Sequence, residues 1–358
     1  MTIAFIGLGL IGGSIAKAIR ERHPDTIIKA YNRGKDVLKE AIADDIVDVA
    51  LPSCEDGLAD CDIIFLCQPV LVALECLPAI KKQLKPGALI TDVGSTKTRI
   101  HEETNKLGLN AHFIGGHPMT GSEKSGYRHS QALLLENAYY LLTPSEEISH
   151  QAVDDFREFV ASLGALPLIL TYQEHDRVVA AVSHVPHLIS ASLVNLVHEA
   201  DSDRQLMKTV AAGGFRDITR ISSSSPEMWR EICLSNGPAI VPLLDRYIEL
   251  LTNYRDAVDN SDSDALIKIF TDCKDFRDSF QGMGRREYRL YCDIIDEEGA
   301  IARIAALLAD HNISLKNIGI VHNREDEPGV LKISFYERNA LARAVRTLKG
   351  SGYTVYEN

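Results

Sequence analysis

Short apolar runs alternate with stretches of helical periodicity along the first half of the chain. The short runs predict buried strands, and apolar residues three or four positions apart predict helices. Repeated strand–helix units build a parallel sheet with helices on both faces, so we expect one α/β domain over residues 1–170. The predicted strands cover residues 2–6, 27–31, 62–67, 88–92, 111–114, 138–143 and 166–170. The first predicted helix runs to about Arg22, and the others cover residues 70–84, 96–106 and 150–163.

The strand pattern stops after Thr171, and helical spacing takes over. We therefore expect an all-helical domain over residues 171–284. Its predicted helix over residues 237–258 carries one apolar stripe, which suits a dimer contact as well as a monomer core. The stripe consists of Ile240, Leu244, Tyr247, Ile248, Leu251, Tyr254 and Val258.

The last part of the chain returns to a mixed pattern. Residues 282–286 contain two adjacent arginines and are typical of a linker. Beyond them the order of predicted elements is βαββαβ, which indicates a ferredoxin-like domain over residues 287–358. Its strands cover residues 288–294, 314–321, 329–336 and 353–356, and its helices cover residues 299–311 and 340–349.

A glycine-rich stretch follows the first predicted strand at once and opens a helix. Gly7 permits a tight turn, Gly9 lets the backbone approach a pyrophosphate, and Gly12 lets the helix pack on the strand. The helix amino terminus, at Leu10 and Ile11, supplies amides and a positive dipole. In this context Gly-x-Gly-x-x-Gly predicts a Rossmann-type site for a nicotinamide dinucleotide, although a glycine-rich turn without a nucleotide has the same composition.

The position that selects between NAD and NADP carries no acid. An acidic residue is expected about twenty positions after the last glycine, where it would hold the ribose hydroxyls and repel a 2′-phosphate. Here that position is Asn32, followed by Arg33. Asn32 can still bond a ribose hydroxyl, and Arg33 could accept a 2′-phosphate or be a solvated surface cation. We therefore expect NAD, with NADP possible.

The candidate chemistry centres on His117, within the glycine-rich stretch 115–126. Four glycines and a proline rule out a regular helix there, so His117 is expected in a rigid loop just beyond the strand 111–114. Ligands of open parallel sheets bind at this edge, and histidine suits proton transfer near neutral pH. Ser95 leaves the preceding strand at the same edge, where it could face the nicotinamide or cap the next helix.

The helical domain adds two polar motifs. Pro186 interrupts its first long helix between two histidines, His184 and His187. Their spacing could suit a metal, but no third ligand follows, so substrate contact or packing is favoured and no metal is expected. Arg220 lies in a glycine-rich joint, where its planar fork could hold a carboxylate or pair with Asp217.

The composition of the chain limits which classes of partner are expected. The formal net charge is −12 and the pI about 5.5, which argues against nucleic acid or an anionic membrane as the main partner. Seven cysteines without a Cys-x-x-Cys pair are typical of reduced thiols in the cytoplasm. The amino terminus does not look like a signal peptide, and we expect no stretch that approaches the roughly 18 apolar residues of a membrane helix.

These motifs together resemble the prephenate dehydrogenase family of tyrosine biosynthesis, in the form with a carboxyl-terminal ACT regulatory domain, and the resemblance covers the whole chain. The matching segments are Gly-Leu-Gly-Leu-Ile-Gly-Gly-Ser at 7–14, Asp-Val-Gly-Ser-Thr-Lys at 92–97, Gly-Gly-His-Pro-Met-Thr-Gly-Ser at 115–122, Ser-His-Val-Pro-His at 183–187 and Gly-Gly-Phe-Arg-Asp-Ile-Thr-Arg at 213–220.

The resemblance implies NAD(P)-dependent oxidative decarboxylation of prephenate to 4-hydroxyphenylpyruvate by a homodimer. It implies that His117 is the catalytic histidine that bonds the ring hydroxyl and that Ser95 is its hydrogen-bonding neighbour. It further implies that Arg220 holds a substrate carboxylate, that His187 contacts the substrate, and that Ser122 and Glu123 belong to an active-site loop.

The resemblance to ACT domains also implies tyrosine as an effector. Gly299 resembles the glycine that lets an amino-acid ligand approach the backbone, and Asn312 and Asn317 flank the next strand's start. A domain that only adds dimer contacts is the alternative. Two other functions stay open: an arogenate dehydrogenase, whose substrate differs by an amino group, and a non-catalytic nucleotide-binding amino-acid sensor.

Overall fold

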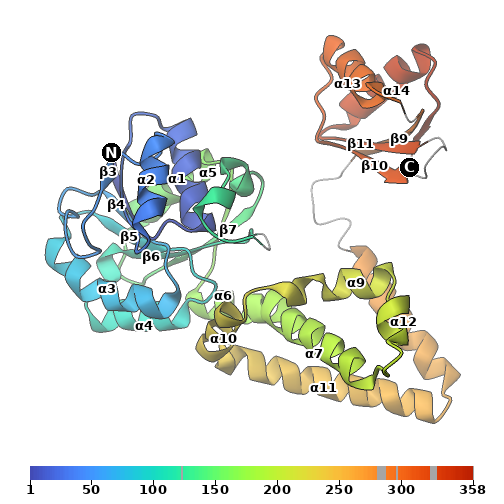
Figure 1. The fold of residues 1–358 in the computed structure, drawn as a ribbon, viewed down its shortest axis with the longest axis horizontal. Coiled ribbons are helices and arrows are strands. Elements are labelled where there is room, and N and C mark those ends of the chain that lie inside the picture. The colour runs from blue at the N-terminus through green and yellow to red at the C-terminus, as the bar shows by residue number, and fades with distance from the viewer. Residues whose placement is uncertain (122–123, 280–287, 296, 323–328, 358) are drawn as a thin grey trace. The chain divides into compact units, whose positions relative to one another are not determined.

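The computed structural model describes residues 1–358 except 122–123, 280–287, 296, 323–328 and 358 (Figure 1). The chain forms two compact units, Met1–Glu249 and Leu250–Asn358. The predicted linker at 282–286 lies outside the described residues, as do Ser122 and Glu123.

The first unit is built on an eight-stranded sheet in the order β3-β2-β1-β4-β5-β6-β7-β8. Every neighbouring pair is parallel except β6 and β7, which are antiparallel. The connection from β6 to β7 contains short 3₁₀ turns among its described residues and no α-helix, so β7 returns beside β6 without a crossover. The strands are β1 Thr2–Ile6, β2 Ile27–Tyr31, β3 Val49–Ala50, β4 Ile63–Leu66, β5 Leu89–Asp92, β6 Phe113–Pro118, β7 Tyr139–Pro144 and β8 Leu166–Ile169.

Helices cover both faces of this sheet, as the alternating pattern predicts (Figure 1). α1, α2 and α5 pack on one face, and α3 and α4 pack on the other. Strand β1 shows why, because Ile3 and Phe5 enter one core while Ala4 and Ile6 enter the other. The helices are α1 Leu10–Arg22, α2 Lys35–Ala43, α3 Val70–Gln83, α4 Thr98–Lys106 and α5 His150–Ser162; the prediction lacked α2 and β3.

His117 lies inside a strand, which corrects the prediction of a loop. A 3₁₀ turn covers Asn110–His112, and β6 then runs to Pro118. A Cβ at Gly115 would lie 2.3 Å from the Thr143 hydroxyl, and one at Gly116 would lie 2.6 Å from the Asp92 carbonyl oxygen. These glycines therefore permit close packing within the sheet and do not mark a turn.

The first helical segment after the sheet contains the predicted interruption. A π-turn, Ala180–His184, separates α6 (Tyr172–Val179) from α7 (Val185–Ala200). Pro186 has no backbone N–H, so the regular bond pattern changes just before it. The remaining helical elements are α8 Leu206–Val210, α9 Gly213–Thr219, the 3₁₀ turn Arg220–Ser223, α10 Pro226–Ser235 and α11 Gly237–Asp259.

The segment Tyr172–Ala200 corrects another expectation. By length and composition it could cross a membrane, with a window of mean hydropathy 1.4. Residues 178–197 contain no Asp, Glu, Lys or Arg, which explains the high value. A single such helix is weak evidence of a span, and the buried His175, Asp176 and His184 within it are hydrogen-bonded inside the first unit.

The second unit contains α12 (Ser263–Ser279) and a four-stranded antiparallel sheet in the order β10-β11-β9-β12. This order, with two helices packed against the sheet, confirms the ferredoxin-like prediction. The strands are β9 Tyr288–Ile294, β10 Asn317–His322, β11 Gly329–Phe335 and β12 Val355–Glu357, and the helices are α13 Ala300–Asp310 and α14 Arg338–Gly350.

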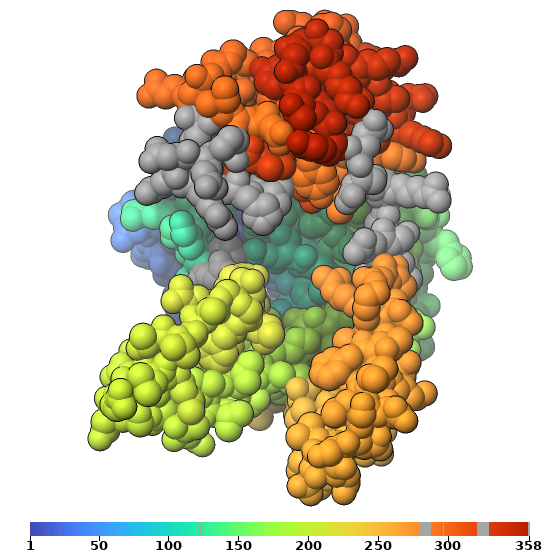
Figure 2. All heavy atoms as spheres, turned by 90° about the vertical axis from the view of Figure 1, so that its right-hand side faces the viewer, coloured from blue at the N-terminus to red at the C-terminus, as the bar shows by residue number. Residues whose placement is uncertain are grey.

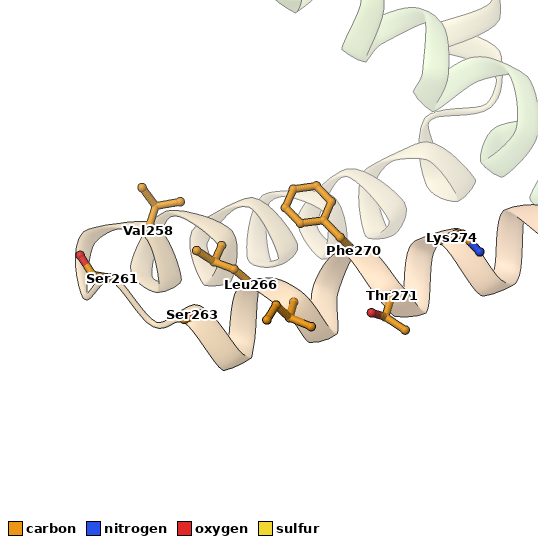
Figure 3. A pocket seen from close by; sticks show the side chains of 8 residues that line it. Val258, Ser261, Ser263, Leu266, Phe270, Thr271 and Lys274 are labelled. Atoms are coloured by element: carbon orange, nitrogen blue, oxygen red, sulfur yellow. The ribbon is translucent and has the colours of Figure 1, made fainter.

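The end of α11 and α12 present apolar side chains to solvent. Val258 is 64% exposed and Phe270 is 71% exposed. The segment from the end of α11 through α12 lies at the surface in Figure 2, where α12 is orange. Between the two helices is a groove of about 680 Å³, and Val258, Leu266 and Phe270 line it (Figure 3). Of the predicted stripe on α11, Ile240 is buried, whereas Ile248, Leu251, Tyr254 and Val258 are exposed.

Candidate active site

The glycine-rich turn has the geometry that its sequence predicts. Gly7 has a φ of 102°, a conformation that favours glycine, and its N–H donates to the Tyr31 carbonyl. A Cβ at Gly12 would lie 2.7 Å from the Gly7 carbonyl oxygen, whereas one at Gly9 would meet no atom within 4 Å. Gly9 is the residue before α1, whose first amides, at Leu10 and Ile11, lack a side-chain cap. The turn therefore presents open backbone donors to an anion.

Asn32, directly after β2, is hydrogen-bonded to the glycine turn. Its Oδ1 accepts from the Leu8 N–H at 3.0 Å, and its Nδ2 donates to the Gly34 carbonyl at 3.1 Å. Sequence reasoning assigned Asn32 only to the ribose, whereas the structure gives it this scaffolding role as well. Arg33 beside it is exposed.

The structure pairs His117 with a second histidine. Nδ1 of His117 lies 2.9 Å from Nε2 of His175, and Nδ1 of His175 lies 2.9 Å from Oδ1 of Asp176. His117 is half-buried, while His175 and Asp176 are buried. A capping box between Thr171 and Glu174 begins α6 and so places both residues in its first two turns.

The carboxylate of Asp176 also caps the amino terminus of α4, a helix of the sheet domain. Its carboxylate accepts from the N–H of Lys97 at 2.8 Å, the N–H of Thr98 at 2.8 Å and the Thr98 hydroxyl at 2.6 Å. This corrects the suggestion that Ser95 caps α4, since the helix begins at Thr98 and a distant carboxylate satisfies its first amides.

Ser95 lies half-buried in the short connection before α4. Among the described residues, no hydrogen bond joins Ser95 to His117, whose Nδ1 is occupied by His175. Its catalytic role stays a prediction.

A buried ion pair supports the same corner of the sheet. Nζ of Lys97 lies 2.5 Å from Oδ2 of Asp92, and both side chains are buried. Nζ also donates to the Gly94 carbonyl, and Asp92 accepts from the amides of Gly94 and Gly116. The pair therefore connects the Ser95 loop to the residue that precedes His117.

Further contacts lead from Asp176 to His187. Nδ2 of Asn236 donates to the Asp176 carbonyl at 2.8 Å and to Nδ1 of His184 at 3.1 Å. Trp229 contacts His184 edge-on and stacks on His187, with ring centroids 3.7 Å apart. Nδ1 of His187 donates to the Ser183 carbonyl, so the site includes His117 and His187 in one contact network.

The histidines of this network are held neutral. Burial lowers the pKa of His117 well below 6.5, and a proton on His175, the cation of Lys97 or a proton on His184 would lower it further by charge repulsion. Burial also lowers the pKa of His184 to about 4 and that of His187 below 6.5. In the described part of the chain, no group of three potential ligands could hold a metal ion.

The remaining predicted residues lie on other elements. Arg220 is exposed at the start of a 3₁₀ turn that packs on α7, the helix of His187. Gly299 precedes α13 with a φ of 81°, and Asn312 follows that helix with a φ of 54°. The Asn312 carbonyl accepts from Arg343, and Asn317 is the first residue of β10.

Sequence reasoning missed five residues of the site. Trp229, the single tryptophan, and the dipeptide of His175 and Asp176 after a capping box were visible signals. Asn236 gave no signal, because its partners Asp176 and His184 are distant in sequence. Lys97 ends the quoted motif at 92–97, where its ion pair with Asp92 was not predicted. The missed residues are Lys97, His175, Asp176, Trp229 and Asn236.

The fold and the site define a class of protein. A Rossmann-type sheet with an open glycine turn binds a dinucleotide, and a neutral histidine at the same edge serves proton transfer. A helical segment closes over this edge through Asp176. The protein is therefore an oxidoreductase that uses a nicotinamide dinucleotide.

Comparisons with known proteins define the family. The profile of the prephenate dehydrogenase nucleotide-binding domain matches residues 15–168, and that of the prephenate dehydrogenase dimerization domain matches residues 171–272. The chain is 38% identical to a prephenate dehydrogenase of Bacillus subtilis, over 97% of this chain and 95% of that protein. The chain belongs to the prephenate dehydrogenase family.

Two solved structures are similar to the chain. The prephenate dehydrogenase of A. aeolicus in complex with hydroxyphenyl propionate and NAD+ has a TM-score of 0.73 and 26% identity, covering 78% of this chain and 98% of its own. The arogenate dehydrogenase of Synechocystis has a TM-score of 0.70 and 31% identity, covering 78% of this chain and 100% of its own.

Proposed function

We propose that this protein oxidises and decarboxylates prephenate to 4-hydroxyphenylpyruvate with NAD as the acceptor. The observation that carries the proposal is the half-buried, neutral imidazole of His117 near the end of β6, at the same carboxyl edge of the sheet as the glycine turn after β1. Prephenate is a dianion whose ring carbon bears both a hydroxyl and the hydrogen that leaves as hydride. Its oxidation therefore needs a neutral base, a cationic fork and a hydride acceptor.

The bound cofactor and the side chains of the site would meet these requirements step by step. Bound NAD supplies the hydride acceptor. As hydride leaves, the ring hydroxyl becomes more acidic, and His117 holds its proton. The bond from the ring to the carboxylate then breaks, carbon dioxide departs, and the electron pair makes the ring aromatic. The proton returns to the oxygen, which is a phenol hydroxyl in the product. Ser95 would bond the same hydroxyl and fix its direction.

Initial rates of the intact protein test this proposal. The assay uses prephenate and arogenate, each with NAD and NADP. We expect turnover of prephenate with NAD, and a protein that binds NAD but turns over neither substrate would refute the proposal. Arogenate is the second candidate substrate, because the similar Synechocystis structure is an arogenate dehydrogenase. We expect measurable activity with NADP as well, since no acid stands at Asn32 and Arg33 is exposed beside it.

Replacing Arg220 by alanine is expected to raise KM for prephenate with a smaller effect on kcat. The change removes a bidentate donor from a substrate carboxylate. Arg220→Lys keeps the charge but loses the planar fork, so its KM should lie between those of the unaltered protein and Arg220→Ala. Steady-state kinetics measure the effect, with Arg157→Ala, in an exposed ion pair with Asp154 on α5, as the control. An unchanged KM would place Arg220 outside the substrate site.

We also propose a homodimer formed through the helical segments. The exposed apolar stripe of α11 and the groove beside α12 offer surface that a second chain would cover. Sedimentation of the intact protein measures its mass in solution.

The seven free cysteines and the acidic composition fit the reducing cytoplasm, which cell fractionation tests.

Tyrosine is the proposed effector, bound by the ferredoxin-like domain near Gly299, Asn312 and Asn317. A chain that ends at Ser279 is expected to stay active and to lose its inhibition by tyrosine. The whole Synechocystis chain corresponds to 78% of this one, which supports activity without the last domain. Rates with and without tyrosine, on both chains, measure this. Equal inhibition of both chains would mean that tyrosine competes at Arg220 and His187.

A further inference from the structure

The hydrogen bonds around His175 assign a proton to each ring nitrogen. The carboxylate of Asp176 accepts three bonds from Lys97 and Thr98. Burial raises the pKa of Asp176, but bonds from His175 and Thr98 hold it below its ordinary value overall. Asp176 is therefore ionised and can only accept, so the proton between it and His175 must lie on Nδ1 of His175.

The second ring nitrogen of His175 is then an acceptor. Burial, above all, lowers the pKa of His175, so its imidazole is neutral and carries a single proton. With that proton on Nδ1, the Nε2 lone pair faces Nδ1 of His117 at 2.9 Å. Two lone pairs would repel each other at this distance, so Nδ1 of His117 must carry the proton that joins the rings.

We infer that His175, oriented by Asp176, is a positioning residue that keeps the proton of His117 on Nδ1 and leaves Nε2 as the atom that accepts from substrate. This deepens the proposed function, because it rests on His117 as the base. The reverse tautomer would place a proton on Nε2 of His117, which could then only donate to the ring hydroxyl. In serine proteases an analogous change of tautomer, made by replacing the aspartate of the triad, lowers kcat by about 10⁴-fold.

The contacts of His175 fit this role better than a purely structural one. A structural histidine would need only its bond to Asp176, which already has three other donors. Instead the His175 ring connects α6 to β6 through its contact with His117, which lies 58 residues earlier in the chain. Its Nε2 contacts the one histidine at the sheet edge that the mechanism uses.

Two substitutions of similar polarity separate these roles. The amide of an asparagine reaches about as far as Nδ1, so His175→Asn keeps the bond to Asp176 and leaves His117 without an acceptor. The amide of a glutamine reaches about as far as Nε2, so His175→Gln can still accept from His117. We expect His175→Asn to lower kcat about 10- to 100-fold with little change in KM for NAD, by analogy with the loss of residues that orient metal-ligating histidines. We expect His175→Gln to retain most of the activity.

The opposite order, with His175→Asn active and His175→Gln impaired, would overturn the inference and make His175 a support for Asp176. Nitrogen NMR of the intact protein with labelled histidines gives an independent answer. Nδ1 of His117 should show the shift of a protonated nitrogen and Nε2 that of a bare one, and His175→Asn should mix the two. A proton on Nε2 of His117 in the unaltered protein would also overturn the inference. If the unaltered protein turned over neither prephenate nor arogenate, the proposed function would fail, while the NMR would still decide the tautomer.

Discussion

His117→Asn is expected to lower kcat by about 10²- to 10⁴-fold, the usual contribution of a positioned acid–base group. Asparagine is polar and of similar reach, and its amide can still contact His175, so the fold should persist. In the described part of the chain no hydrogen bond joins His117 to the glycine turn, so the affinity for NAD should stay the same. Steady-state rates measure kcat, and quenching of Trp229 fluorescence or calorimetry measures NAD binding.

The pH dependence provides the control. His117 acts as a base only when neutral, and its pKa in the folded protein is lowered chiefly by burial. Any proton gained by His175 or His184, and the cation of Lys97, lower it further. Activity should therefore persist as the pH falls through 6.5, the ordinary histidine value, and be lost only at lower pH. The residual activity of His117→Asn should lack this acid loss. A variant with nearly unchanged kcat would show that His117 is structural.

The sequence predicted the sheet domain well because its signals are local. Apolar runs and glycine spacing depend on neighbouring residues, and both marked β1 and α1 correctly. His117 was found for the same reason. The wrong prediction of a loop at Gly115 and Gly116 arose because glycine has two uses, and the choice depends on Thr143 and Asp92, which only the fold brings close.

The supports of the site could not be predicted in this way. The carboxylate that begins α4 is Asp176, nearly eighty residues later, where local capping rules suggested Ser95. The direction of β7 likewise depends on the connection from β6, whose described residues contain no α-helix. Contacts between residues distant in sequence leave a weak trace in local patterns, and the bonds of Asn236 to Asp176 and His184 are of this kind.

Lys97→Met is expected to destabilise the first unit by about 3–5 kcal/mol, the usual cost of removing one partner from a buried ion pair. Methionine fills much of the same volume but leaves the Asp92 carboxylate buried without its cation. The carbonyl of Gly94 also loses a donor. Because Asp92 accepts from the Gly116 amide, its disturbance should reach His117 and lower kcat as well. Urea unfolding followed by fluorescence of Trp229, the single tryptophan, reports on this unit alone.

An exposed pair of similar length is the matched control. Lys85 lies 2.7 Å from Asp62, with both side chains partly solvated, so Lys85→Met should cost less than about 1 kcal/mol. The double variant Asp92→Asn with Lys97→Met removes both charges and keeps an acceptor for one of the two amides. Because no unpaired charge is left buried, it should be more stable than Lys97→Met alone. Equal urea midpoints for Lys97→Met and Lys85→Met would mean that the buried pair contributes no more than a surface one, and the corner beneath His117 would then be held by its hydrogen bonds.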